Sequence, residues 1–129
     1  GGTLTGIVRA SFPDQRIQGY PALRTSSLEK EIGHWMPKDN WELISDYHFG
    51  GYGKINSSLI HFINEFREVT GVPLDPVYTG KMIYGILQEI RRGRIPEGSQ
   101  VLAIHTGGLQ GIAGMNMRLR KKNLPLLYL

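Results

Sequence analysis

Residues 74–108 are the most informative stretch of this chain, because they place polar loop residues at both ends of one short helix and strand unit. Tyr78 and Thr79 lie on a turn that opens an amphipathic helix, and Thr106 follows an apolar run after that helix. Open parallel sheets bind their ligands at the carboxyl ends of the strands. The unit therefore predicts a binding site that combines this turn with the loop after the apolar run.

Two long amphipathic helices are predicted from apolar residues at intervals of three and four. One spans about residues 56–70 and stops at Gly71, and the other spans about residues 79–92 and stops at Gly93. The positions expected to face the core are Leu59, Phe62, Ile63, Phe66, Val69, Met82, Ile83, Ile86, Leu87 and Ile90.

Short strands are predicted at residues 17–23 and 41–47, and a helix between them opens on a capping box of Ser26 and Glu29. The uninterrupted apolar run of residues 101–104 predicts a strand that is buried on both faces of a parallel sheet. This alternation is typical of an α/β fold with a layered, mostly parallel open sheet and helices on both faces. Because so few strands are predicted, we expect an incomplete sheet and a C-terminal fragment of a longer protein.

The composition excludes several classes of function. The chain has no cysteine, which removes disulfides, thiolate metal sites and thiol nucleophiles, and its 4 histidines show no metal-ligand spacing. No apolar run has the length of a membrane helix, and a cytoplasmic location is expected. The net charge of +4 comes from basic residues near the end of the second long helix and at residues 118–122, without a nucleic-acid-binding motif. We therefore expect no metal, no nucleic-acid partner and no membrane partner.

Glycine-rich turns occur in two further places. Gly1, Gly2 and Thr3 run into a predicted helix start, where backbone N–H groups and the helix dipole can hold a phosphate. For the two glycines, an expression scar is the alternative. Tyr52 lies in the glycine-rich loop at residues 48–53, where a tyrosine by itself is more often a packed corner than a catalyst.

Three motifs, GGYGKIN, LDPVYTGK and HTGG, occur in an order and spacing that resembles the C-terminal part of a known enzyme family. This is the 1-aminocyclopropane-1-carboxylate deaminase / D-cysteine desulfhydrase family of pyridoxal-phosphate enzymes, with the tryptophan-synthase-β-like fold (fold type II). The resemblance implies that residues 1–129 are the C-terminal part of the large cofactor-binding domain, and that the N-terminal half of the enzyme is not present. It also implies a homodimer that breaks down a small amino acid to a 2-oxo acid and ammonia.

The resemblance implies roles for individual residues. Gly1, Gly2 and Thr3 resemble the end of the family's phosphate-binding loop. Tyr52 and Tyr78 resemble two active-site tyrosines that stand beside the cofactor ring and the substrate. A tyrosine hydroxyl in such a place can donate a hydrogen bond or, with a lowered pKa, transfer a proton.

Thr79 and Thr106 are the remaining cofactor-binding positions that the resemblance implies, and they bear on the substrate. Thr106 resembles the hydroxyl residue that meets the pyridine nitrogen. In family members that open the aminocyclopropane ring, these two positions look like glutamate and leucine. The two threonines of this chain resemble the combination in the desulfhydrases. A neutral hydroxyl leaves a weaker electron sink than a carboxylate, and β-elimination tolerates that. D-cysteine desulfhydrase-type β-elimination is therefore expected, with 1-aminocyclopropane-1-carboxylate deaminase as the alternative. For Thr79, the alternative role is the N-cap of the helix that it opens.

Other polar residues are weaker candidates. Lys54 and Lys81 do not match the position of the family's Schiff-base lysine, so this chain alone is not expected to catalyse a reaction. His105 is expected to be a hydrogen-bonded structural histidine, and no chemistry is predicted for Asp46 or Asp75. A non-catalytic cofactor-binding or interaction module is the alternative from another class of function.

Overall fold

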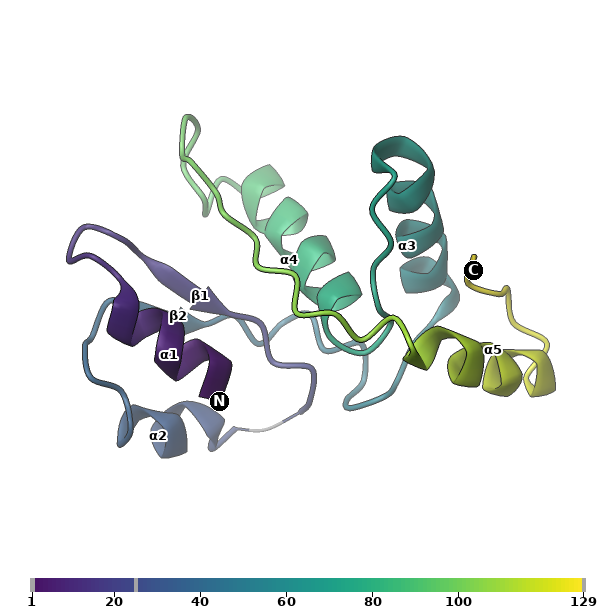
Figure 1. Ribbon diagram of the computed structural model, residues 1–129, viewed down its shortest axis with the longest axis horizontal. Helices are drawn as coiled ribbons and strands as arrows, with labels where there is room; N and C mark the ends of the chain where they lie inside the picture. Colours follow the sequence, from purple (N-terminus) through teal and green to yellow (C-terminus); the bar gives the residue numbers. More distant parts are fainter. Residues whose placement is uncertain (1, 25, 129) are drawn as a thin grey trace.

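The computed structural model describes residues 2–24 and 26–128, and Figure 1 shows the arrangement of their helices and strands. In that view α1, α2 and the two strands lie on one side, α3 and α5 lie on the other, and α4 lies between the two groups. The elements in chain order are α1 (Gly2–Ala10), β1 (Ile17–Gly19), α2 (Leu28–Gly33), β2 (Trp41–Leu43), α3 (Ser57–Thr70), α4 (Thr79–Arg91) and α5 (Gly111–Lys121).

The sheet of the described residues is a small parallel pair. Ile17 of β1 lies opposite Trp41 of β2, and Gly19 lies opposite Leu43. The connection between the strands contains α2, as a parallel pair requires a crossover. A Cβ at Gly19 would lie 2.9 Å from side-chain atoms of Leu4 and Leu43, so α1 packs closely on this strand. The predicted parallel α/β arrangement is present, but only as a two-stranded sheet in the part of the chain that is described.

The apolar run at residues 101–104 forms no strand, which corrects the prediction of a buried one. Leu102 is 86% exposed, and Val101 and Ile104 are also exposed. A strand needs a neighbour that pairs with its backbone N–H and C=O groups, and β1 and β2 pair only with each other within the described residues. The layered sheet with helices on both faces is therefore not formed by these residues alone.

Helix α3 agrees with its prediction at both ends. The Asn56 side chain accepts a hydrogen bond of 2.9 Å from the backbone N–H of Leu59, as an N-cap does. Gly71 follows the helix in the left-handed region, with φ of 76°, which suits a glycine C-cap. Val69 was expected to face the core but is 78% exposed, because the apolar cluster extends along α3 only as far as Phe66.

Helix α4 also begins and ends near the predicted residues, and Gly93 follows it with φ of 73°. Its buried residues include Ile86, but Leu87 and Ile90 are exposed, which corrects their predicted inward position. The hydrophobic contacts of α4 are concentrated toward α3, where Ile83 packs against the main core. The remaining apolar positions therefore stay uncovered in this part of the chain.

A second buried face of α4 is polar and aromatic. The Tyr47 hydroxyl donates to the Glu89 carboxylate at 2.8 Å, and the Arg94 guanidinium lies 3.2 Å from the same carboxylate. A Cβ at Gly85 would lie 2.7 Å from the ring of Tyr20, so only glycine allows this close approach. This face joins α4 to the segments that follow β1 and β2.

Helix α2 starts one residue later than its predicted capping box implies. Ser27, rather than Ser26, takes the N-cap position. Its hydroxyl donates to the Glu31 side chain at 2.9 Å, so the partner is not Glu29. Helix boundaries that are read from local patterns are commonly displaced by a residue or two.

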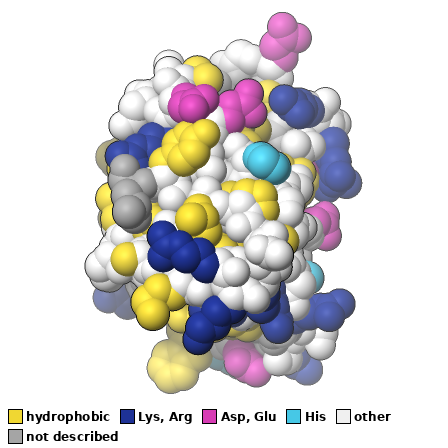
Figure 2. Space-filling view, turned by 90° about the vertical axis from the view of Figure 1, so that its right-hand side faces the viewer, with side chains coloured by type: hydrophobic (Ala, Val, Ile, Leu, Met, Phe, Trp, Pro, Cys, Tyr) yellow, Lys and Arg dark blue, Asp and Glu magenta, His cyan; other side chains and the backbone are white. Residues whose placement is uncertain are grey.

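The main hydrophobic core lies between α3, α5 and the C-terminal segment. Two buried asparagines fix that segment: Asn64 bonds the backbone of Leu126 and Tyr128, and Asn116 bonds both backbone groups of Leu127. Figure 2 looks onto the side of the molecule that carries α3 and α5, and it shows several Lys and Arg side chains in its lower half. The core residues are Leu59, Ile60, Ile63, Leu74, Ile112, Met115, Leu119 and Leu127.

Across residues 2–24 and 26–128, no helix combines the length and the apolar character that a membrane crossing requires.

Candidate functional site

The turn before α4 is organised by Asp75, a residue for which the sequence predicts no chemistry. One carboxylate oxygen accepts hydrogen bonds from the backbone N–H groups of Val77 at 2.8 Å and Tyr78 at 2.9 Å. The other accepts from the N–H and the hydroxyl of Thr79, both at 2.7 Å. Asp75 is 1% exposed, so these bonds form away from water. They satisfy backbone donors at the start of α4 and thereby fix the backbone that carries Tyr78.

Thr79 belongs to the same cap. Its hydroxyl donates to the Asp75 carboxylate and accepts a hydrogen bond of 2.8 Å from the backbone N–H of Asp75. Thr79 is the first residue of α4, and Tyr78 takes the N-cap position, so the predicted N-cap role of Thr79 is wrong by one residue. The contact of Thr79 with a cofactor stays a prediction, and its hydroxyl hydrogen is already given to Asp75.

Tyr52 and Tyr78 meet, although they lie on separate segments. The Tyr78 hydroxyl donates to the Tyr52 hydroxyl at 3.1 Å. Their ring centroids are 6.0 Å apart and the ring planes are inclined by 64°, which is a favourable edge-to-face arrangement. Tyr52 is 60% exposed and Tyr78 is 48% exposed, so a ligand can reach both hydroxyls. The two tyrosines thus form one accessible polar site, and their catalytic role stays a prediction.

The hydrogen bond to Tyr52 raises the pKa of Tyr78, and burial adds to this effect. A raised pKa keeps Tyr78 protonated, so it favours a hydrogen-bond donor over the proton-transfer group with a lowered pKa that the sequence also allows. The stability that this bond contributes is present below the ordinary tyrosine pKa of about 10 and is lost as the pH rises through the pKa in the folded protein.

We expect that replacing Tyr52 with phenylalanine lowers the pKa of Tyr78 toward the ordinary value of about 10, because the largest cause of the shift is removed. Phenolate absorbance measured against pH reports this change. Subtracting the titration of the Tyr52→Phe/Tyr78→Phe double variant from that of Tyr52→Phe isolates the signal of Tyr78 without the Tyr52 hydroxyl. Subtracting the titration of Tyr78→Phe from that of the unaltered protein gives the signal with this hydroxyl present. A Tyr78 titration that is the same with and without the Tyr52 hydroxyl would show that the bond has no such effect.

The glycine-rich loop that carries Tyr52 is attached to α4 by Lys81. Gly50 and Gly51 have φ of 99° and 130°, which only glycine adopts without strain. The Lys81 ammonium donates to the carbonyl oxygens of His48 at 2.8 Å and Gly51 at 3.0 Å. Lys81 is 1% exposed, and burial lowers its pKa. Its nitrogen is occupied by these backbone contacts, and the expectation that it is not the Schiff-base lysine stays a prediction.

The loop of residues 105–108 lies against the turn before α4. The Nε2 atom of His105 is 2.8 Å from the carbonyl oxygen of Pro73, so this histidine makes the structural hydrogen bond that the sequence predicts. A Cβ at Gly108 would lie 3.0 Å from Cγ of Asp75, which shows how closely the loop backbone approaches that carboxylate. Thr106 is exposed between these two contacts. The loop that contains Thr106 therefore lies beside the turn that carries Tyr78.

The predicted phosphate-binding residues occupy another part of the fold. Gly2 and Thr3 are exposed at the beginning of α1, which packs against β1, and Gly1 lies outside the described residues. An exposed helix start suits an anion, because its first backbone N–H groups lack partners within the helix. Their contact with a phosphate stays a prediction.

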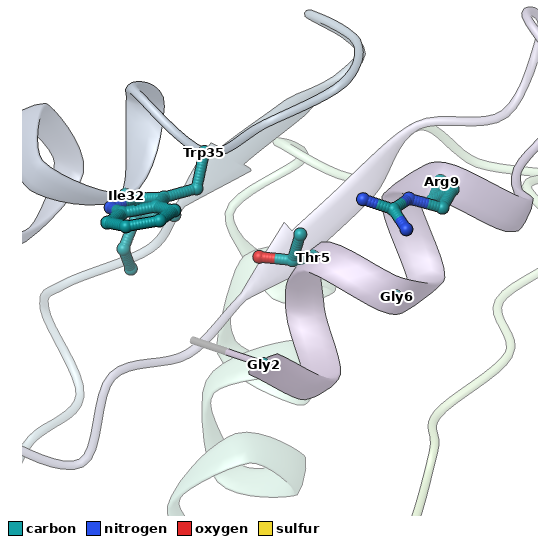
Figure 3. Close-up of a pocket in the computed structure, with 6 residues that line it drawn as sticks. All are labelled: Gly2, Thr5, Gly6, Arg9, Ile32 and Trp35. Atoms are coloured by element: carbon teal, nitrogen blue, oxygen red, sulfur yellow. The ribbon is translucent and has the colours of Figure 1, made fainter.

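One hollow lies beside α1, and neither tyrosine lines it. Figure 3 shows it between α1 and the end of α2, with the Trp35 ring on one side and Thr5 and Arg9 on the other. It has a volume of about 470 Å³ and is open to solvent. The lining residues are Gly2, Thr5, Gly6, Arg9, Ile32 and Trp35.

The residues that the resemblance indicates can be compared with the groups that pyridoxal phosphate presents. Among the residues that the structure describes, no group of three or more His, Cys, Asp and Glu side chains is arranged to hold a metal ion. Among the predicted site residues, Tyr52, Tyr78 and Thr106 are exposed, as are Gly2 and Thr3 at the start of α1. Hydroxyls and backbone N–H groups match the phosphate and ring substituents of pyridoxal phosphate. The residues present thus fit part of such a group.

A small parallel sheet with surrounding helices and an exposed tyrosine pair defines this chain as a mixed α/β fragment with a polar surface site. A search of solved structures adds the crystal structure of "the ACC deaminase homologue", which is 30% identical with a TM-score of 0.77. The match covers 93% of this chain and 39% of that chain. The fold of these residues is therefore that of part of this homologue.

Sequence comparison gives the same relationship, although no family model matches the chain. A putative 1-aminocyclopropane-1-carboxylate deaminase of Pyrococcus furiosus is 40% identical over 68% of this chain and 27% of its own length. The 1-aminocyclopropane-1-carboxylate deaminase of Allorhizobium ampelinum is 35% identical over 91% of this chain and 35% of its own length. The chain is homologous to one part of the proteins of the 1-aminocyclopropane-1-carboxylate deaminase family. It spans about a third of the length of these relatives.

Proposed function

We propose that the protein containing this chain is a pyridoxal-phosphate-dependent enzyme that breaks down a small amino acid to a 2-oxo acid and ammonia. The observation that carries the proposal is the meeting of Tyr52 and Tyr78, with a hydroxyl distance of 3.1 Å, in a chain homologous to such deaminases. Bound pyridoxal phosphate supplies an electron sink for the substrate carbon that loses a proton. The lysine that holds the cofactor is proposed to lie in the two-thirds of the relatives' length that this chain does not span.

The two tyrosines have different tasks in this proposal. Tyr78 stays protonated and gives its hydrogen to Tyr52, so the hydrogen of the Tyr52 hydroxyl is available to a substrate or cofactor oxygen. Thr106 offers a second hydroxyl beside the same turn and would face the pyridine nitrogen. Gly2 and Thr3 would hold the phosphate through the start of α1.

The names of the relatives favour 1-aminocyclopropane-1-carboxylate over D-cysteine as the substrate. The preference for D-cysteine depended on two threonine hydroxyls near the cofactor ring. Thr79 gives its hydrogen to the buried Asp75, so its residue type is explained by the turn. Thr106 alone now supports the desulfhydrase reaction, which we keep as the second candidate.

Spectra and product analysis of the complete protein test this proposal. We expect a visible absorbance band that borohydride removes, release of a four-carbon 2-oxo acid and ammonia from 1-aminocyclopropane-1-carboxylate, and slower release of pyruvate from D-cysteine. If D-cysteine releases pyruvate and sulfide faster than 1-aminocyclopropane-1-carboxylate releases its 2-oxo acid, the desulfhydrase reaction replaces the deaminase reaction as the proposed function. Absence of the band after incubation with pyridoxal phosphate would exclude the proposed cofactor and leave a non-catalytic module.

Tyr78→Phe is expected to lower kcat by about 10-fold, because the Tyr52 hydroxyl loses the hydrogen bond that orients it and such a bond contributes about 1 kcal/mol. Tyr128→Phe is the matched control, because Tyr128 is also about half exposed but lies in the C-terminal segment. Steady-state kinetics of both variants with the accepted amino acid provide the measurement. Equal kcat values for the two variants would remove Tyr78 from the reaction.

A further inference from the structure

Lys81 is a buried cation that contacts three segments of backbone. Its ammonium donates to the carbonyl oxygens of His48 at 2.8 Å, Gly51 at 3.0 Å and Ala22 at 3.3 Å. A lysine ammonium has three hydrogen atoms to donate, so three carbonyl acceptors satisfy it completely. With 1% of its surface exposed, Lys81 has no access for a water molecule to take over these bonds.

Burying the Lys81 ammonium costs free energy, which indicates that this lysine has a specific role. Burial disfavours the charged form and lowers the pKa of Lys81, and the Asp75 carboxylate opposes that effect. An apolar side chain of similar length would avoid this desolvation cost. It would remove the donor that joins the loop to α4 and leave the His48 and Gly51 carbonyl oxygens only their local bonds, 3.2 Å from the Gly51 N–H and 3.0 Å from the Lys54 N–H. That loop contains three glycines in the left-handed region.

The ammonium connects the two segments that carry the tyrosines. Lys81 lies three residues after Tyr78, within the first turn of α4. The carbonyl group of Gly51 belongs to the same planar peptide unit as the backbone nitrogen of Tyr52. A hydrogen bond to this carbonyl therefore limits the orientation of the Tyr52 backbone relative to α4.

We propose that Lys81 is a positioning residue that holds Tyr52 against Tyr78 by binding the carbonyl oxygens of the glycine-rich loop. The effect of Lys81 on turnover rests on the proposed function. Its effect on the contact between Tyr52 and Tyr78 does not. Lys54 is the internal comparison, because it directly follows the glycine-rich loop and is exposed.

The first test measures the tyrosine pair in the complete protein without any substrate. Tyrosines are replaced biosynthetically with fluorotyrosine, and the ¹⁹F signal of Tyr78 is assigned by its loss in Tyr78→Phe. In the unaltered protein and in Lys54→Met, we expect Tyr52→Phe to shift the Tyr78 signal. In Lys81→Met, we expect this shift to disappear, because the loop no longer holds the Tyr52 ring near Tyr78.

Two further variants keep the test decisive. Lys81→Gln has two donors on a shorter side chain and serves if Lys81→Met does not fold; the shift is expected to disappear there too. Lys81→Arg keeps a cation and several donors and is expected to restore part of the shift. A full Tyr52-dependent shift in folded Lys81→Met or Lys81→Gln overturns the proposal.

Kinetics provide the second test. We expect Lys81→Met to lower kcat about as much as Tyr52→Phe does, with no further loss when the two are combined, because both remove the same contact. Losses that multiply would show that Lys81 supports activity only through general stability, which contradicts the proposal. If the ¹⁹F result holds while the unaltered protein turns over no amino acid, the positioning role stands and the proposed function fails.

Discussion

Asp75→Ala is expected to lower the free energy of unfolding by about 3 kcal/mol, because it removes a helix cap and leaves several backbone donors unsatisfied. The carboxylate accepts four hydrogen bonds of 2.7 to 2.9 Å from Val77, Tyr78 and Thr79, and it is 1% exposed. Urea unfolding of the complete protein, followed by circular dichroism, measures the change.

Two controls define the cause of this loss. Asp46→Ala removes an exposed carboxylate that lies 3.6 Å from Arg94, and it is expected to change stability by less than about 1 kcal/mol. Asp75→Asn keeps one acceptor oxygen and is expected to fall between the other two variants. Equal stability of Asp75→Ala and Asp46→Ala would show that the turn before α4 does not depend on the buried carboxylate.

The second large effect is expected at Gly80, where alanine should destabilise the fold by about 2 kcal/mol through overpacking. A Cβ there would lie 2.7 Å from the backbone oxygen of Asp75 and 2.7 Å from Cδ1 of Ile63. The backbone oxygen cannot move without breaking its bond of 2.9 Å to the Gly80 N–H. Thermal or urea unfolding of Gly80→Ala provides the measurement.

Gly114→Ala is the matched control for that substitution. Gly114 also lies inside a helix, but a Cβ there meets nothing within 4 Å. Alanine is expected to stabilise this position by about 0.5 to 1 kcal/mol, because it lowers the entropy of the unfolded chain without strain. Stabilisation by alanine at both positions would contradict the close approach of α3 to the start of α4.

Much of the helical structure could be predicted, because its signals are local. Asn56 and Gly71 mark the ends of α3, and Gly93 marks the end of α4. The resemblance to the deaminase family also indicated Tyr52 and Tyr78, which the structure places together. The helix ends depended on residues whose physical effect is confined to one turn, whereas the two tyrosines were indicated by the resemblance alone.

Other predictions failed where long-range packing decides. The run at residues 101–104 has the composition of a buried strand, but no strand pairs with it in the described part of the chain. Leu87 and Ile90 follow the helical period of α4 and are nevertheless exposed. Asp75 lies four residues before Thr79 and outside the N-cap position, so the local pattern gave no sign that its carboxylate organises the start of α4.

The amino-acid sequence by itself determined where α3 and α4 start and stop, because capping side chains and glycine C-caps act over a few residues. Only the tertiary structure decided that Tyr52 meets Tyr78, since that contact joins residues 26 positions apart in the chain. The buried Lys81 ammonium reaches carbonyl groups 30 and 33 positions away. Contacts of this kind depend on how the segments pack, and no local pattern specifies them.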